Sequence, residues 1–92
     1  MNTQQLLEEE RKIWSDKKQS LEHIVICMGK TYGDIAKQAR NQLEGKAVNK
    51  AELQKELGNI VTSTIRWIDD LGFDVDDCLD LALDSQRAYQ NN

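Results

Sequence analysis

The 92-residue chain contains no proline and only five glycines. Because proline interrupts helices and both residues supply turns, this composition favours long helices over a turn-rich β sandwich. The two cysteines belong to no CxxC motif or Cys/His cluster with metal spacing, and there is one histidine, so we expect neither a transition-metal site nor a Cys/His nucleophile. Cys27 and Cys78 lie far apart, outside any metal-binding motif, and we expect both to be buried, reduced thiols.

A surplus of basic residues is also missing. The chain has 12 lysines and arginines against 16 aspartates and glutamates, for a net charge of −4. A domain that binds duplex nucleic acid normally carries the opposite balance, so we expect no such partner. The longest apolar run, residues 24–28, is too short to cross a membrane, and the acidic start of the chain is unlike a secretory signal. These features indicate a cytoplasmic protein with no membrane partner.

Four segments have the apolar spacing of amphipathic helices, at about residues 3–16, 20–44, 50–71 and 75–89. N-caps are expected at Ser20, Asn49 and Asp74, and helix ends at Gly45 and Gly72. The third segment has the clearest apolar stripe, formed by Leu53, Leu57, Ile60, Val61, Thr64, Ile68 and Leu71. We therefore predict a single all-α domain, residues 1–92, folded as a four-helix bundle.

Some details of this bundle stay open. Apolar residues make up 39% of the chain, a modest core for its length, so we expect dimerisation to complete the bundle. Residues 23–27 are helical in this interpretation, although such a short apolar stretch would also suit a buried strand. Gly29 and Gly33 either let another helix approach closely or kink their own helix. The three glutamates at residues 8–10 are predicted to form a solvated face.

Familiar motifs are excluded by their spacing. Residues 23–31, HIVICMGKT, lack the first glycine of a P-loop, because Ile24 occupies that position. The aspartate-rich residues 69–80 do not contain an EF-hand loop, since the twelfth position counted from Asp74 is Ser85 instead of glutamate. A Ser/His/Asp hydrolase is unsupported, because the single histidine stands alone in the sequence.

Polar residues on two of the predicted helices form a candidate metal site. One line of the second helix carries Cys27, Thr31, Asp34 and Gln38, and one line of the third carries Glu52, Glu56, Asn59 and Asp70. If these helices pack antiparallel across their short connection, Asp34 and Glu56 approach each other. Oxygen ligands on facing helices suit Mg²⁺. The alternative is ordinary surface charge at the edge of the bundle.

The second half of the chain resembles a known family. Residues 56–83, ELGNIVTSTIRWIDDLGFDVDDCLDLAL, look like the C-terminal half of the MazG-type all-α nucleoside triphosphate pyrophosphohydrolases, with the family's corner motif at residues 69–77. Residues 32–37, YGDIAK, stand where the family has E-x-G-E-(L/V)-A. Trp14 lies in a short first helix of the expected kind, and the likeness extends over about residues 14–86.

The resemblance implies a Mg²⁺-dependent enzyme with a house-cleaning role. Such an enzyme hydrolyses a nucleoside triphosphate, here expected to be a deoxynucleotide, to the monophosphate and pyrophosphate. The family's ExxE pair falls on Thr31 and Asp34, and its ExxD pair falls on Glu56 and Asn59. Two of these four metal-ligand positions are therefore neutral. Asp34 and Glu56 are the implied catalytic residues.

Four further residues are expected to contact the substrate, namely Trp14, Lys30, Gln86 and Arg87. In the last helix, Ala82 and Gln86 stand where the family often has Lys and Asn for the substrate. The family also implies a homodimer or a dimer of dimers. Because half of the carboxylates are missing, the alternative is a catalytically impaired module on the same fold, which binds nucleotide or a partner protein without turnover.

Overall fold

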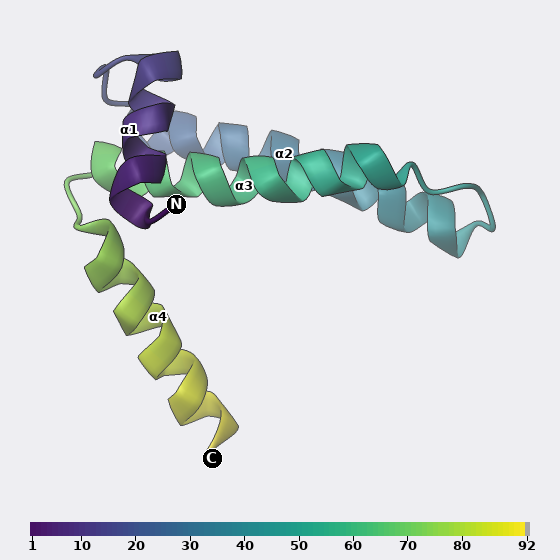
Figure 1. Cartoon of the computed structure of the whole chain (residues 1–92). Coiled ribbons are helices and arrows are strands. Elements are labelled where there is room, and N and C mark those ends of the chain that lie inside the picture. The colour runs from purple at the N-terminus through teal and green to yellow at the C-terminus, as the bar shows by residue number, and fades with distance from the viewer. Residues whose placement is uncertain (92) are drawn as a thin grey trace.

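Residues 1–91 are described by a computed structural model, in which they form four α-helices and no strand (Figure 1). The helices are α1 (Thr3–Trp14), α2 (Leu21–Leu43), α3 (Lys50–Asp70) and α4 (Val75–Gln90). The predicted all-α class is confirmed, and the short apolar stretch at residues 23–27 is helical. Each helix begins and ends close to its predicted position because the local capping signals set these boundaries.

The caps follow the side-chain chemistry of the sequence. The side chains of Ser20, Asn49 and Asp74 each accept a hydrogen bond from the backbone N–H three residues later, as N-caps do. Gly45 follows α2 with φ 72°, and Gly72 follows α3 with φ 85°. These left-handed conformations favour glycine, which has no Cβ to clash with the backbone.

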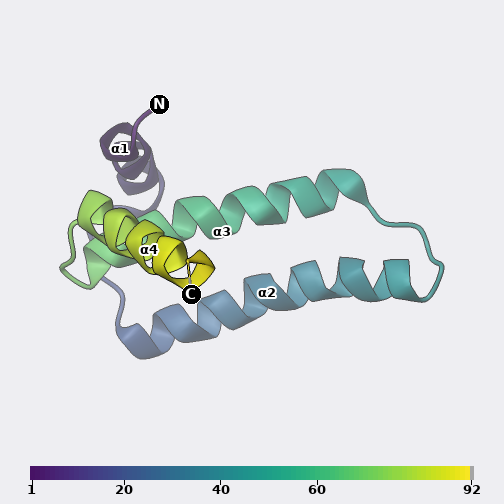
Figure 2. The ribbon, with the colours of Figure 1, turned by 90° about the horizontal axis from the view of Figure 1, so that it is seen from below.

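The two longest helices, α2 and α3, run antiparallel and side by side as a hairpin (Figure 2). Oε1 of Gln38, whose side chain is buried on α2, accepts a hydrogen bond from the backbone N–H of Asn49 at 3.0 Å. This bond fastens the connection between the helices to α2. The hairpin is the frame on which the other two helices pack.

Helix α1 crosses the end of the hairpin and is held there by charged side chains (Figure 1). Nη2 of Arg11 lies 2.6 Å from Oδ2 of Asp69 and 2.6 Å from Oδ1 of Asp70. Nζ of Lys18 lies 2.9 Å from the same Oδ2 of Asp69. Asp70, which the sequence put on one line with Glu56, therefore belongs to this ionic contact between α1 and α3.

The apolar core of the single chain is small. Its buried apolar side chains are Ile24, Ile65, Trp67 and Val75. Leu57, Val61 and Leu71 belong to the stripe predicted on α3, yet all three are exposed. The reason is geometric: α1 and α2 pack on other sides of α3, so Leu57 and Val61 are still 49% and 58% exposed within residues 1–91.

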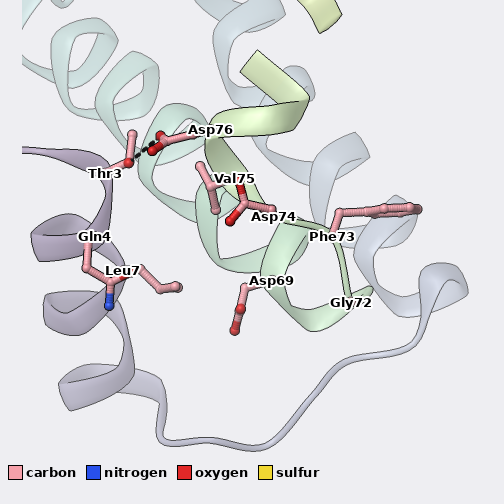
Figure 3. Close-up of a pocket in the computed structure, with 9 residues that line it drawn as sticks. All are labelled: Thr3, Gln4, Leu7, Asp69, Gly72, Phe73, Asp74, Val75 and Asp76. Carbon is pink, nitrogen blue, oxygen red and sulfur yellow. Dashed lines mark hydrogen bonds between the residues drawn. The ribbon is translucent and has the colours of Figure 1, made fainter. Parts of the chain in front are cut away.

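Helix α4 leaves the end of α3 and points away from the hairpin (Figure 1). It packs against α3 near its own beginning, where Val75 is buried, whereas Leu79 and Leu83 further along are exposed. Oγ1 of Thr3 donates a hydrogen bond to Oδ1 of Asp76 at 2.6 Å, which connects α1 to the first turn of α4 (Figure 3). None of the helices in the described chain combines the length and apolar character that crossing a membrane requires.

Three local expectations need correction or refinement. Cys27 and Cys78 are free thiols, but each is half-buried instead of buried. Glu10 is buried and does not belong to a solvated face. A methyl group at Gly29 or Gly33 would meet no atom within 4 Å, so no helix approaches closely at these glycines within residues 1–91.

Candidate functional site

A groove of about 720 Å³ lies between α1, α2 and α3. Six of the eight site residues predicted from the sequence line it: Trp14 from α1, Lys30, Thr31 and Asp34 from α2, and Glu56 and Asn59 from α3. The residues of α2 and those of α3 are far apart in the sequence. Antiparallel packing of these two helices brings them together. We call this feature the groove.

Glu56 and Asn59 lie about one turn apart on α3 and contact each other. Nδ2 of Asn59 donates a hydrogen bond to Oε1 of Glu56 at 3.4 Å, and Nζ of Lys55 lies 3.8 Å from the same oxygen. Glu56 is buried, whereas Asp34 on the facing helix is exposed. With the amide nitrogen of Asn59 directed at Glu56, its Oδ1 remains available to a cation.

Thr31 contributes a second neutral oxygen to this end of the groove. Its Oγ1 donates a hydrogen bond to the carbonyl oxygen of Cys27 at 3.3 Å, which leaves the lone pairs of the hydroxyl free to accept or to bind a cation. The donor set is then two carboxylates, Asp34 and Glu56, with two neutral oxygens. Mg²⁺ prefers oxygen ligands and is often held by one or two carboxylates together with substrate phosphates, so these residues fit it.

The described residues contain no cluster of three or more His, Cys, Asp or Glu side chains that could hold a metal ion without help. Asp34 and Glu56 alone supply the negative charge among the predicted ligands. A divalent cation at this position would therefore depend on further oxygens from a bound ligand. A cation site here would therefore be a shared one, completed by an anionic ligand.

The other end of the groove is built around Arg66. Its Nη1 donates a hydrogen bond to Oε1 of Glu10 at 3.2 Å, and both side chains are buried. The guanidinium carbon lies 4.6 Å from the ring centre of Trp14 and 5.7 Å from that of Trp67, which are cation–π distances. Trp14 itself is 55% exposed, so much of its ring is open to a flat ligand.

The remaining predicted substrate contacts lie in different surroundings. The exposed side chain of Lys30 lines the groove. Gln86 and Arg87 lie on α4 and do not line it. Nη1 of Arg87 instead donates a hydrogen bond to Oδ1 of Asp84 at 3.0 Å. Within one chain, Gln86 and Arg87 therefore lie apart from the six predicted site residues that line the groove.

Sequence reasoning missed Glu10 and Arg66. Arg66 continues the line of Glu56 and Asn59 at helical spacing, and this spacing was a usable signal that it faces the same groove. Glu10 had no comparable signal, because it is one of three consecutive glutamates. Which of the three is buried depends on how α1 crosses α3.

A separate hollow of about 250 Å³ lies between the start of α1 and the corner of α3 and α4 (Figure 3). Three aspartates line it, but each already has a structural partner. Asp69 pairs with two basic side chains, Asp74 caps α4, and Asp76 accepts a hydrogen bond from Thr3. These contacts account for the aspartates, and we assign no ligand to this hollow.

Comparison with known protein families, curated proteins and solved structures finds no match to this chain. The assignment of a function therefore depends on the geometry of the groove and on the residue pattern of the sequence.

Proposed function

We propose that the groove binds a nucleoside triphosphate together with Mg²⁺, and that the protein hydrolyses it to the monophosphate and pyrophosphate. The expected substrate class is a deoxynucleotide, and the role is removal of unwanted nucleotides from the pool. The observation that carries this proposal is the presence of Asp34, Glu56, Thr31 and Asn59 in one groove with the open ring of Trp14.

The length of the groove supports a ligand with two different ends. Glu56 and Arg66 are ten residues apart on α3, and at the rise of a helix this separates them by about 15 Å. Oxygen ligands lie near Glu56, and aromatic rings surround Arg66. A molecule with a polyphosphate at one end and an aromatic base at the other suits this arrangement.

The resemblance to the MazG-type pyrophosphohydrolases supports the same assignment. The positions that correspond to the family's two acidic pairs, Thr31 with Asp34 and Glu56 with Asn59, line the groove from facing helices. The resemblance comes from the residue pattern of the sequence, whereas the groove comes from the packing of the helices, so the two observations are independent. Agreement between them is the reason for preferring nucleotide chemistry to a surface-charge explanation.

Each residue has a role that its surroundings allow. Bound Mg²⁺ would neutralise phosphate oxygens and make an attacking water more acidic. Asp34 and Glu56 would hold the cation, and a carboxylate not engaged by the metal would accept a proton from water. The ammonium group of Lys30 binds a phosphate oxygen, and Trp14 stacks on the base.

The experiment is a pyrophosphate-release assay with Mg²⁺ on common and damaged deoxynucleoside and nucleoside triphosphates. The wild-type protein should release pyrophosphate from at least one of them, and Glu56→Gln and Asp34→Asn should abolish the release. Glu52→Gln is the matched control, because Glu52 lies one turn before Glu56, pairs with Lys55 and does not line the groove. Absence of release from every nucleotide would refute the enzymatic proposal.

A catalytically impaired nucleotide-binding module is the second candidate. The observation that favours it is that only two of the four predicted ligand positions carry carboxylates, and that residues 1–91 contain no group of three His, Cys, Asp or Glu side chains placed to hold a metal ion. A nucleotide at a hundredfold its Kd stabilises its binding protein by about 2.7 kcal/mol, which thermal melting detects. Stabilisation by Mg²⁺ and nucleotide without release of pyrophosphate would establish this second function. A protein-interaction role alone would give neither result.

We propose, in addition, that the active form is a homodimer or a dimer of dimers. Several apolar side chains that do not line the groove are exposed in the single chain: Leu21, Val25 and Tyr32 on α2, Leu57 and Val61 on α3, and Leu79 and Leu83 on α4. Amphipathic helices of this kind normally bury their apolar stripes. A second copy would cover them and complete the bundle.

A further inference from the structure

A second hollow, of about 440 Å³, adjoins the groove where the chain passes from α1 into α2. Its basic lining residues are Lys17, Lys18, His23 and Arg66, and we call it the basic pocket. It shares Trp14, Gln19, His23 and Arg66 with the groove, so the two hollows meet at these side chains. The function proposed above uses the groove and assigns no ligand to the basic pocket.

The charged side chains that line the basic pocket are all basic. No aspartate or glutamate lines it, although acidic residues outnumber basic ones in the chain as a whole. Lys18 is partly neutralised by Asp69 and Arg66 by Glu10, and both acids lie outside the pocket. Lys17 forms no ion pair within residues 1–91 and keeps its full charge for a ligand. An anion is therefore the complementary occupant.

Arg66 provides the second and independent indication of an anion. Its side chain is 5% exposed, and its one hydrogen bond in the described chain runs from Nη1 to Glu10. Nε and Nη2 donate to no protein group, although buried donors are nearly always satisfied. Neither nitrogen is sealed from solvent, and Arg66 lines the basic pocket, so both are open to a bound acceptor. A guanidinium in this state matches the paired oxygens of a phosphoryl group.

The start of α2 adds to this arrangement. Ser20, the N-cap of this 23-residue helix, lines the basic pocket, so the positive end of the helix dipole is directed toward it. We propose that the basic pocket binds a phosphoryl group through Arg66, Lys17 and His23. This site does not require Mg²⁺, because side chains supply its positive charge. The phosphoryl group comes either from free pyrophosphate or from the polyphosphate arm of a nucleotide other than the one whose phosphates are proposed to lie near Glu56.

The test uses the fluorescence of Trp14 and Trp67, the only tryptophans in the chain, of which Trp14 lines the basic pocket. The full-length protein is titrated with pyrophosphate or dATP, in EDTA and at constant ionic strength. Each should give a saturable change, and the change with pyrophosphate reports the binding of a phosphoryl group without a base. Equal affinities would identify a site for the free anion, and tighter binding of dATP would identify the arm of a nucleotide. Either outcome supports the proposal.

Variants show whether the basic pocket is responsible. Lys17→Ser combined with His23→Gln should weaken pyrophosphate binding about tenfold or more, since each charge-assisted hydrogen bond contributes substantially. Both side chains are exposed, so the fold should survive the changes. Lys37→Ser is the matched control, because Lys37 lies on α2 outside both hollows, and its removal should leave the affinity unchanged.

Two results would overturn the proposal: no saturable change with pyrophosphate, or an equal loss of affinity in the Lys37→Ser control. The titrations contain no Mg²⁺ and follow no hydrolysis. Failure of the basic pocket is therefore distinguishable from failure of the proposed enzymatic function, which the pyrophosphate-release assay measures separately.

Discussion

Arg66 and Glu10 form a buried ion pair, with 3.2 Å between Nη1 and Oε1, at the point where α1 crosses α3. Two indole rings flank the guanidinium, those of Trp14 and Trp67. The pair holds α1 over the hairpin, and α1 is one wall of the groove. The shape of the candidate site therefore depends on a contact that lies beside the proposed chemistry.

Breaking this pair should cost much more stability than breaking an exposed one. Glu10→Ala leaves the charge of Arg66 buried without a partner, and we expect a loss of about 3–5 kcal/mol in the free energy of unfolding. Glu9→Ala removes the exposed pair of Glu9 with Lys12, and the expected loss is much smaller, because solvent screens an exposed pair. Urea unfolding measures both. Similar losses for the two variants would show that the buried pair has no special role.

The contact between α1 and the end of α3 should depend on pH. A hydrogen bond from Arg11, together with one from Lys18, holds the pKa of Asp69 below its ordinary value of 3.8. A carboxylate with a lowered pKa in the folded state stabilises the protein at pH values above the unfolded pKa. That contribution is lost as the pH falls through the folded pKa.

Asp69→Asn removes this contribution. The difference in free energy of unfolding between wild type and variant should be constant above about pH 5 and should shrink at pH values below 3.8. Asp80→Asn is the control, since Asp80 is an exposed residue of α4 outside the contact. Urea unfolding as a function of pH measures the differences. A difference for Asp69→Asn that grows toward low pH would contradict this interpretation.

Two glycines should respond in opposite ways to the same substitution. Gly72 has φ 85°, and alanine there should cost about 1–2 kcal/mol, because a Cβ is disfavoured in the left-handed conformation. Gly58 lies inside α3, and alanine there should stabilise by about 0.5–1 kcal/mol. Neither Cβ would meet an atom within 4 Å, so no steric clash complicates the comparison. Thermal or urea unfolding should give these opposite signs, and equal signs would argue against the conformational explanation.

The proposed dimer predicts a specific response at Val61. Light scattering over a range of concentrations should detect a dimer or a tetramer of the wild-type chain. Val61→Glu should shift the population toward the monomer, because it puts a charge into the apolar face that the second copy covers. Gln54→Glu is the control, since Gln54 is a polar, exposed residue of the same helix. A wild-type chain that stays monomeric at every concentration would exclude this assembly.

The helices could be predicted from the sequence because their signals are local. Ser20, Asn49 and Asp74 cap the next helix with their own side chains, and Gly45 and Gly72 end the previous one. Exposure could not be predicted in the same way. The spacing on α3 shows that Leu57 and Val61 share a stripe, but the positions of α1 and α4 decide that it stays exposed in one chain.

The candidate site could be predicted only where two long helices carry it. Asp34 lies on α2 and Glu56 lies on α3. They line one groove because the short connection makes these two helices pack antiparallel, side by side. Glu10 and Arg66 meet through the crossing of α1 over α3, which depends on tertiary packing and has no marker in the spacing. The same limit applies to Arg87, because helical periodicity does not show where α4 points.

The central claim is that Asp34 and Glu56 hold Mg²⁺ against a nucleoside triphosphate in the groove. The most direct test is a crystal structure of the protein with Mg²⁺ and a deoxynucleoside triphosphate whose bond between the α- and β-phosphates resists hydrolysis. The account predicts a metal ion in contact with both carboxylates and with phosphate oxygens, and a base near Trp14. A groove that stays empty at saturating ligand, or a nucleotide bound elsewhere, would contradict it.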